Sequence, residues 1–204
     1  MEKIFRIIAR ISIFIYPVWL QNKVRTQFDK IYTWRIASQF KSFMGGRIER
    51  NIHVWNGQNI TIGSGVYIGK NSHLATHPNH SYLNPEIIIG NCCNFGEQVH
   101  ITCANRIKIG NGLLTGRRCT ITDNSHGKSE RSVLDMNPNL RPIESKGSVV
   151  IGNNVWLGDN VIVLPGVTIG DGVVVGANSV VTKNIPSYSV AVGNPAKVVK
   201  SFGE

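Results

Sequence analysis

Aliphatic residues recur every six positions along the C-terminal half of the chain. The most regular series consists of Ile151, Leu157, Val163, Ile169, Val175 and Val181. The same spacing occurs earlier at Ile62 and Ile68, at Ile89, Phe95 and Ile101, and at Ile109, Thr115 and Ile121. A period of six is neither the 3.6 of an α-helix nor the alternation of a hairpin strand, and it is typical of a parallel β-helix built from hexapeptide repeats. We therefore predict an all-β domain over residues 46–204, in which each repeat supplies a short strand, a turn and an inward-pointing side chain.

Two segments interrupt this period and are predicted to be loops. Residues 75–86 carry closely spaced prolines and histidines, and residues 127–147 carry Pro138, Pro142 and many charged groups. A smaller irregularity, the eight residues from Ile101 to Ile109, predicts a bulge or a wider corner. Because loops on a rigid scaffold are where binding and catalytic residues concentrate, we look for chemistry at these interruptions.

The N-terminal region has helical periodicity instead. Residues Ile4, Ile8, Ile11 and Ile15 share an arc of about 60° on a helical wheel, and Lys3, Arg6 and Arg10 fall on nearly the opposite side. Pro17 ends or kinks this helix. A second stripe begins with Leu20, Val24, Phe28 and Ile31 and is predicted to run towards Phe43, stopping at Gly45-Gly46. Residues 1–45 are therefore predicted to form a basic amphipathic helical segment.

The charge of the chain is concentrated in the same region. The 204 residues carry a net charge of +10, and residues 1–50 hold ten Lys or Arg against three acidic residues. A basic amphipathic helix can lie on an anionic membrane surface, and it can equally cap the open end of a solenoid or pack on a partner subunit. Both interpretations of residues 1–43 stay open at this point.

Composition excludes several classes of protein. Hydrophobic residues make up 42% and charged residues 17%, which excludes a disordered chain or a coiled coil. The four cysteines form no CxxC pair, and Cys93 and Cys119 fall on inward positions of the six-residue frame, as small core side chains do. We expect a cytoplasmic protein with reduced thiols, in peripheral contact with the inner membrane surface if the helices bind lipid. Without a phosphate-binding loop or a recognised DNA- or RNA-binding module, nucleic acid is not an expected partner.

Four C-terminal stretches resemble a known family. They are Asn154–Gly158, Leu164–Gly170, Val175–Lys183 and Gly193–Lys197. They are similar to the cofactor-binding half of the hexapeptide-repeat acyltransferases, and the pattern is nearest to that of the galactoside, maltose and polysaccharide O-acetyltransferases. The resemblance covers roughly residues 58–200. It implies a left-handed parallel β-helix, acetyl-CoA as the acyl donor, and a homotrimer whose sites lie between neighbouring β-helices.

The segment Ile121–Gly127 resembles the catalytic segment of that family, commonly Asp-His-Asp-His-Gly, and places the catalytic role on His126. A neutral imidazole can take a proton from a sugar hydroxyl as the hydroxyl attacks the thioester, and the imidazolium can then protonate the departing thiolate. Asn124 and Ser125 depart from the family pattern, so Asp123 becomes the candidate for orienting His126. Glu97, Glu144 and a backbone carbonyl are open alternatives, and the oxyanion is expected to meet a backbone N–H near residues 158–160.

The resemblance also implies the ligand-binding residues. Trp156 is expected beside the pantetheine arm or at a subunit interface, and Gly158 and Ala177 are expected to allow close approach of the cofactor. The candidates for the adenosine 3′-phosphate are Thr182, Lys183, Lys197 and Lys200, of which the last two can also be read as a solvated tail. His77 and Asn94 are the candidates for acceptor contacts. The set His73, His77 and His80 lacks the spacing of a zinc site, so no metal is expected.

The sequence therefore predicts an acetyl-CoA-dependent O-acetyltransferase that acts on a saccharide, such as a precursor of a surface polysaccharide or lipopolysaccharide. N-acetylation of an amino sugar, acetylation of a xenobiotic and a catalytically silent scaffold are the alternatives.

Overall fold

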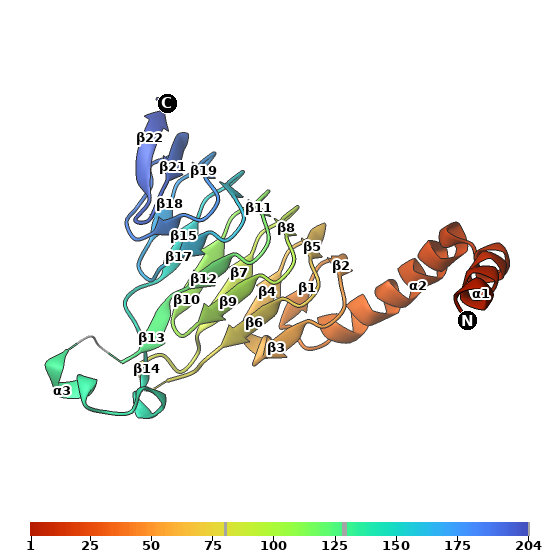
Figure 1. Ribbon diagram of the computed structural model, residues 1–204. Helices are drawn as coiled ribbons and strands as arrows, with labels where there is room; N and C mark the ends of the chain where they lie inside the picture. The colour runs from red at the N-terminus through yellow and green to blue at the C-terminus, as the bar shows by residue number, and fades with distance from the viewer. Residues whose placement is uncertain (80, 128–129, 204) are drawn as a thin grey trace.

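A computed structural model describes residues 1–79, 81–127 and 130–203, in which three mainly parallel sheets wind around one core (Figure 1). Sheet A consists of β1 (Ser42–Phe43), β4 (Ile60–Ile62), β7 (Glu86–Ile89), β10 (Arg106–Ile109), β15 (Val149–Ile151) and β18 (Thr168–Ile169). Sheet B consists of β2 (Gly46–Ile48), β5 (Val66–Ile68), β8 (Asn94–Phe95), β11 (Leu114–Thr115), β16 (Trp156–Leu157), β19 (Val174–Val175), β21 (Ser189–Val192) and β22 (Lys197–Ser201). Sheet C consists of β3 (His53–Trp55), β6 (His73–Thr76), β9 (His100–Cys103), β12 (Thr120–Thr122), β17 (Ile162–Val163) and β20 (Val180–Val181).

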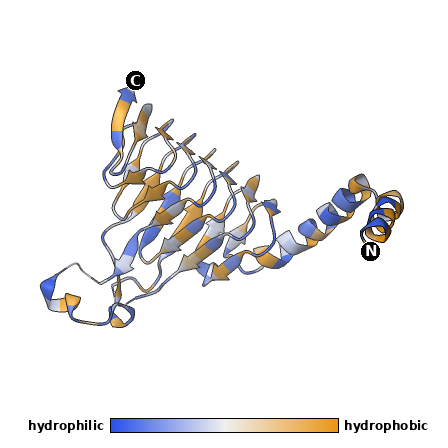
Figure 2. Cartoon of the chain, viewed as in Figure 1, coloured by the Kyte–Doolittle hydropathy of each residue, from blue (hydrophilic) through white to orange (hydrophobic). Residues whose placement is uncertain are grey.

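Each coil visits sheets A, B and C in turn, and equivalent residues of successive coils stack on one another. In sheet A, for example, Ile62 pairs with Ile89, Ile89 with Ile109, and Ile109 with Ile151. All four side chains are at most 2% exposed. Figure 2 shows hydrophobic residues, in orange, along many strands of the β-helix. Cys93 and Cys119 are buried at the inward positions predicted for them. This confirms that each six-residue repeat forms one side of a β-helical coil.

Glycine and asparagine occupy the corners for steric reasons. A Cβ added to Gly158 would lie 2.6 Å from the backbone nitrogen of Ala177 in the next coil, so glycine is required there for the coils to stack at all. Asn160 and Asn178 adopt the left-handed conformation at equivalent corners, with φ of 58° and 60°, which asparagine tolerates better than most residues. The Asn160 side chain also donates to that of Asn178 at 2.9 Å, which ties one corner to the next.

The N-terminal segment forms two helices, α1 (Glu2–Ile15) and α2 (Val18–Ala37), which meet at Pro17 as expected. The prediction that the second helix runs towards Phe43 is wrong, because α2 ends at Ala37. Beyond it, the backbone nitrogen of Met44 donates to the carbonyl of Ile62, and β1 pairs with β4. Residues 38–43 therefore do not continue the helix as predicted. Phe40 is buried, and the first coil already begins at residue 42, where the chain pairs with the edge of sheet A.

Helix α2 caps the first coil, but with a different face from the predicted stripe. Its buried residues are Asp29, Thr33, Ile36 and Ala37, whereas Phe28 and Ile31 of the stripe are 64% and 66% exposed. The Thr33 hydroxyl accepts from the backbone nitrogen of Ile48 at 3.0 Å, which satisfies an edge group of sheet B. The buried Asp29 carboxylate accepts from Arg47 and Arg50 at 3.1 and 3.3 Å. Polar contacts to the edge therefore anchor this helix.

Both interruptions of the frame leave the β-helix at the same corner, between sheets C and A. The first connects β6 to β7 through residues 77–85, a slightly shorter span than the predicted 75–86. The second is a hairpin whose stem pairs β13 (Asn124–His126) antiparallel with β14 (Ile143–Ser145), so the excursion begins earlier than the predicted residue 127. Its described tip holds α3 (Arg131–Leu134) and the short 3-10 turn η2 (Pro138–Leu140); a further 3-10 turn, η1 (Gly57–Asn59), precedes β4.

Candidate functional site

His126 is the last residue of β13, at the base of the projecting hairpin. It lies opposite Ile143 of β14, and its side chain is exposed. The stem is continued by a hydrogen bond from the backbone nitrogen of Gly127 to the carbonyl of Pro142 at 2.8 Å. The hairpin stands away from the β-helix and does not fold back over it (Figure 1). A paired strand therefore positions His126 firmly while leaving its imidazole open to solvent.

Asp123, which directly precedes β13, has a different role from the predicted one. Its fully buried carboxylate accepts hydrogen bonds from the backbone nitrogens of Ala104, Asn105 and Arg106, at 2.7, 2.9 and 2.8 Å. These three residues form the corner between β9 and β10, which is the wider corner that the Ile101–Ile109 spacing predicts. Because the carboxylate is fully engaged by this corner, the prediction that Asp123 orients His126 is not supported.

The other two acidic candidates for orienting His126, Glu97 and Glu144, accept no hydrogen bond from it in the described residues either. Glu97 lies at the corner after β8 and pairs with Lys70 at 3.3 Å. Glu144 lies on β14 opposite Ser125, so the alternation of side chains places it on the other face of the hairpin stem from His126. Within the described residues, no carboxylate receives a hydrogen bond from His126.

His77 lies near His126, at the start of the first interruption. Its backbone nitrogen donates to the carbonyl of Cys103 at 2.7 Å, which holds it at the same corner. Burial lowers the pKa of the His77 imidazole, and nearby His100 and His126 lower it further, against an opposing effect of Asp123. His77 is therefore a neutral hydrogen-bonding group near pH 7, which is consistent with the acceptor contact predicted for it. His80 lies outside the described residues.

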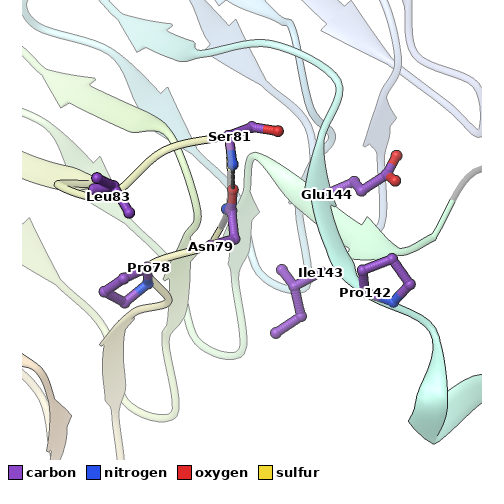
Figure 3. A pocket seen from close by; sticks show the side chains of 7 residues that line it. All are labelled: Pro78, Asn79, Ser81, Leu83, Pro142, Ile143 and Glu144. Carbon is purple, nitrogen blue, oxygen red and sulfur yellow. Dashed lines mark hydrogen bonds between the residues drawn. The ribbon is translucent and has the colours of Figure 1, made fainter.

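A groove separates the two interruptions beside these histidines. Its volume is about 670 Å³, and it is lined by Pro78, Asn79, Ser81, Leu83, Pro142, Ile143 and Glu144. Figure 3 shows Pro78 and Leu83 on one wall and Pro142 and Ile143 on the other, with the Asn79 side chain accepting from the backbone nitrogen of Ser81. Apolar walls with a few polar groups suit a small polar ligand. Both walls belong to the interruptions 75–86 and 127–147, where the sequence led us to expect chemistry, although they lie more than fifty residues apart along the chain.

Three histidines form a row on the outer face of sheet C. His53 pairs with His73 and His73 with His100, each one coil further along. The rings of His73 and His100 stack with centroids 4.9 Å apart and planes 9° from parallel. Burial lowers the pKa of His73, assisted by its histidine neighbours, and burial lowers the pKa of His100. The fold therefore favours the neutral form of both imidazoles.

This row predicts that acid weakens the fold. Below pH 6.5 the unfolded chain protonates His73 and His100 while their lowered pKa values keep them neutral in the folded chain, so the stabilisation present above pH 6.5 is lost as the pH falls towards the lowered values. We expect the urea concentration at the midpoint of unfolding to decrease when the pH is lowered from 7.5 to 5.5. The variant His73→Thr/His100→Thr, which repeats Thr120 of the next coil, should show a smaller fall. An equal fall in the variant and the parent would contradict this assignment.

Three of the predicted cofactor residues, Trp156, Gly158 and Ala177, line a second groove at the corner between sheets B and C. It has a volume of about 460 Å³ and is lined by Gly116, Trp156, Gly158, Asp159, Val174, Val175, Gly176 and Ala177. Trp156 is 51% exposed, so its ring presents a flat apolar wall. Gly158 belongs to the groove, but stacking of the coils already requires a glycine there, so its type is not explained by ligand approach alone.

The groove also contains a backbone N–H without a hydrogen-bond acceptor among the described residues, that of Asp159. The nitrogens of Gly158 and Asn160 donate to the carbonyls of Val175 and Arg117, so they are engaged in coil stacking. One coil earlier, the Arg117 nitrogen is satisfied by the Asp159 side chain at 2.8 Å. Ala177 occupies the equivalent position in the coil after Asp159, but its methyl side chain cannot accept a hydrogen bond from the Asp159 backbone nitrogen. Among the described residues, none accepts a hydrogen bond from the backbone nitrogen of Asp159. Of the residues 158–160 expected to supply a backbone N–H to the oxyanion, Asp159 is therefore the one whose N–H is available.

The candidates for phosphate binding lie at the C-terminal end of the β-helix. Lys197 and Lys200 lie on β22, which turns back antiparallel on β21, and the Lys200 ammonium lies 4.6 Å from the centre of the Phe202 ring. Thr182 and Lys183 directly follow β20 and are exposed. The two groups are linked where the Ala196 nitrogen donates to the carbonyl of Val180 at 2.8 Å. The four residues thus approach one end of the molecule from sheets B and C.

Within one chain the predicted site is divided between two corners. His126 and His77 lie where sheets C and A meet, and the groove at Trp156 lies where sheets B and C meet. Asn94 lies in sheet B, in the same outward row as Leu114 and Trp156, so within one chain it lies away from His77, on the side of the groove. In Figure 1 the hairpin of β13 and β14 projects from the side of the β-helix opposite to β8 and β11.

Residues 148–183 match the family described as bacterial transferase hexapeptide (six repeats). Over 110 residues, 52% of its length, the chain is 38% identical to a protein of Escherichia coli (strain K12) that is named as a lipopolysaccharide biosynthesis O-acetyl transferase, WbbJ. That match covers 56% of the relative, and the chain spans less than two thirds of the first curated relatives it matches.

Two solved structures extend the likeness over most of the chain. A maltose O-acetyltransferase from Clostridium difficile 630 is 32% identical with a TM-score of 0.52, and the match covers 82% of this chain and 72% of the other. A galactoside acetyltransferase in complex with coenzyme A is 26% identical with a TM-score of 0.55, and the match covers 81% and 67%. With the hexapeptide coils, these likenesses confirm the left-handed parallel β-helix expected from the sequence.

Proposed function

Because the chain belongs to the hexapeptide-repeat family of bacterial acyltransferases, we propose that it transfers an acetyl group from acetyl-CoA to a hydroxyl group of a saccharide. The observation that carries this proposal is the exposed, strand-held imidazole of His126 in a chain that also has a groove lined by Trp156 and Ala177. The finer proposal is that the saccharide is a precursor of a surface polysaccharide or lipopolysaccharide. It is supported by the likeness to a relative named for lipopolysaccharide biosynthesis.

The chemistry assigned to His126 is general acid–base catalysis. The neutral imidazole takes the proton of the acceptor hydroxyl while the hydroxyl oxygen forms a bond to the carbonyl carbon of the thioester. The imidazolium then gives this proton to the thiolate as the carbon–sulfur bond breaks, so free coenzyme A and an acetyl ester leave. The backbone N–H of Asp159 is our candidate donor to the oxyanion that forms between these steps.

We further infer that each site is completed by a second copy of the chain, in a homotrimer. One chain presents its histidine corner and its groove on different sides, so a neighbouring β-helix must bring a groove to His126 if both take part in one reaction. The exposed apolar residues of the hairpin tip, Leu134, Met136 and Leu140, provide a surface for such a neighbour. The expected cytoplasmic location stays a prediction.

Release of free coenzyme A thiol from acetyl-CoA, measured across a panel of sugars and lipid-linked glycans, tests the proposal. We expect release that depends on an acceptor, with a base-labile ester as the product. The Ala177→Asn variant supplies the acceptor that the Asp159 N–H lacks, and it should lower kcat/KM for acetyl-CoA about tenfold or more. The control is Arg117→Asn, which places the same side chain at the equivalent corner of an earlier coil, is not among the residues that line the groove, and should leave kcat/KM within about threefold.

Two outcomes would contradict the proposal. A protein that neither binds acetyl-CoA nor releases thiol with any acceptor would be a scaffold. A base-stable product would instead identify an amide, and therefore N-acetylation of an amino sugar.

A further inference from the structure

Helix α1 is an apolar helix without a partner in the described chain. None of its residues is buried, and the exposed fractions of Ile4, Ile8, Ile11 and Ile15 range from 52% to 71%. A helix of 14 residues is marginally stable in water on its own, since most helical stability in proteins comes from packing of an apolar face. The isoleucine face therefore requires a cover that the rest of this chain does not provide.

The charges beside this face indicate what the cover is. Lys3, Arg6 and Arg10 lie on one side of α1, across from the isoleucine stripe, and only Arg6 among them has an acidic partner in the described chain, Glu2 at 2.6 Å. Figure 2 shows the two sides of α1 in different colours, orange and blue. A face of isoleucines with a row of long cationic side chains across from it fits a surface that is apolar in its interior and anionic at its border. An anionic phospholipid bilayer has this construction.

The geometry of the two helices presents α1 for such a contact. Helix α2 carries α1 away from the β-helix to the end opposite the C-terminus, and the axes of α1 and α2 are bent by 63° at Pro17 (Figure 1). In the described residues no single helix is long and apolar enough to cross a membrane, whereas the bent pair meets that test together by length and composition. The exposed Trp19, just after the bend, is a residue type enriched at membrane–water boundaries.

We propose that α1 lies in the surface of an anionic phospholipid bilayer. Its isoleucine face inserts among the acyl chains, Lys3, Arg6 and Arg10 contact the phosphate groups, and α2 acts as the spacer to the β-helix. The strong polar anchor of α2, through Asp29 and Thr33, fixes the β-helix relative to this surface. In a trimer with parallel β-helices, the three copies of α1 would bind the same surface together, which strengthens weak individual contacts.

Flotation of the full-length protein with vesicles tests this proposal without acetyl-CoA or any acceptor, so its failure is separate from failure of the proposed reaction. The vesicles contain phosphatidylglycerol and phosphatidylethanolamine, or phosphatidylcholine alone. We expect at least tenfold stronger binding to the anionic vesicles, weakened by salt. The Ile8→Glu/Ile11→Glu variant should lower this binding at least tenfold. The matched control, Ala9→Glu/Ile13→Glu, adds the same charge on the other side of α1 and should lower it less than threefold.

Three results would overturn the proposal. They are equal binding of both variants, equal binding to both kinds of vesicle, and a change of molecular mass in light scattering for Ile8→Glu/Ile11→Glu without any loss of vesicle binding. The last result would show that the isoleucine face packs on a second copy of the chain. Circular dichroism of both variants controls for loss of helix, and turnover of a soluble acceptor controls for loss of the folded β-helix.

Discussion

The His126→Ala protein should release coenzyme A from acetyl-CoA about a hundredfold to ten-thousandfold more slowly than the parent, at saturating acceptor. The reason is that His126 is the exposed imidazole at the base of the hairpin, and in the proposed reaction it both removes the hydroxyl proton and returns it to the thiolate. Thiol release in a spectrophotometric assay measures the effect. Binding of acetyl-CoA should change little, because the substitution leaves the residues that line the groove unchanged.

A mixing experiment makes this prediction sharper. Neither His126→Ala nor Ala177→Asn alone should be fully active, but subunits of the two variants, unfolded together and reassembled, should regain part of the activity. Regain is expected only if the histidine of one copy works with the groove of another. If His126→Ala retains full turnover, His77 becomes the candidate base, because it lies at the same corner and its pKa is lowered by burial and by its histidine neighbours. If no mixture regains activity, the proposal of a shared site is wrong.

The second large effect is expected on stability, at Asp123. Replacing Asp123 by alanine removes the acceptor of three backbone N–H groups in a corner that is largely closed to water. Each buried donor left without a partner costs about 1–3 kcal/mol, so we expect the free energy of unfolding to fall by about 3 kcal/mol or more. Asp123→Asn should lose stability as well, because its amide group turns two hydrogens towards donors. Urea unfolding at pH 7.5 measures both losses.

The same pair of variants separates the two roles considered for Asp123. If the carboxylate holds the corner, Asp123→Asn loses stability while its remaining folded fraction keeps the pH dependence of kcat of the parent. If the carboxylate orients His126, stability is kept and the pH dependence of kcat shifts. The Cys103 thiol, which donates to Asp123 at 3.3 Å, gives a second indicator. Burial and the neighbouring carboxylate raise its pKa, so Cys103 should become more reactive to alkylation when Asp123 is replaced.

Much of the fold could be predicted because the relevant signal is local and repeated. A side chain that points inward once in six residues must be small or aliphatic at every coil, and Ile151, Leu157 and Val163 carry that requirement openly. The site residues His126 and Trp156 could be proposed for a related reason, since each lies in a short stretch that resembles a known family. Neither prediction depends on which segments meet across the fold.

The remaining features depend on contacts between segments that are distant in sequence. Asp123 lies within the predicted catalytic segment, yet its partners lie in the corner that follows the strand of the preceding coil, and the stacking of coils decided its role. The stripe of Phe28 and Ile31 has helical spacing, but Thr33 and Asp29 match the exposed edge of sheet B, so edge hydrogen bonds and ion pairs selected the other face of α2. Periodicity specifies which residues share a face of one element, whereas the surface against which that face packs is set by the three-dimensional path of the chain.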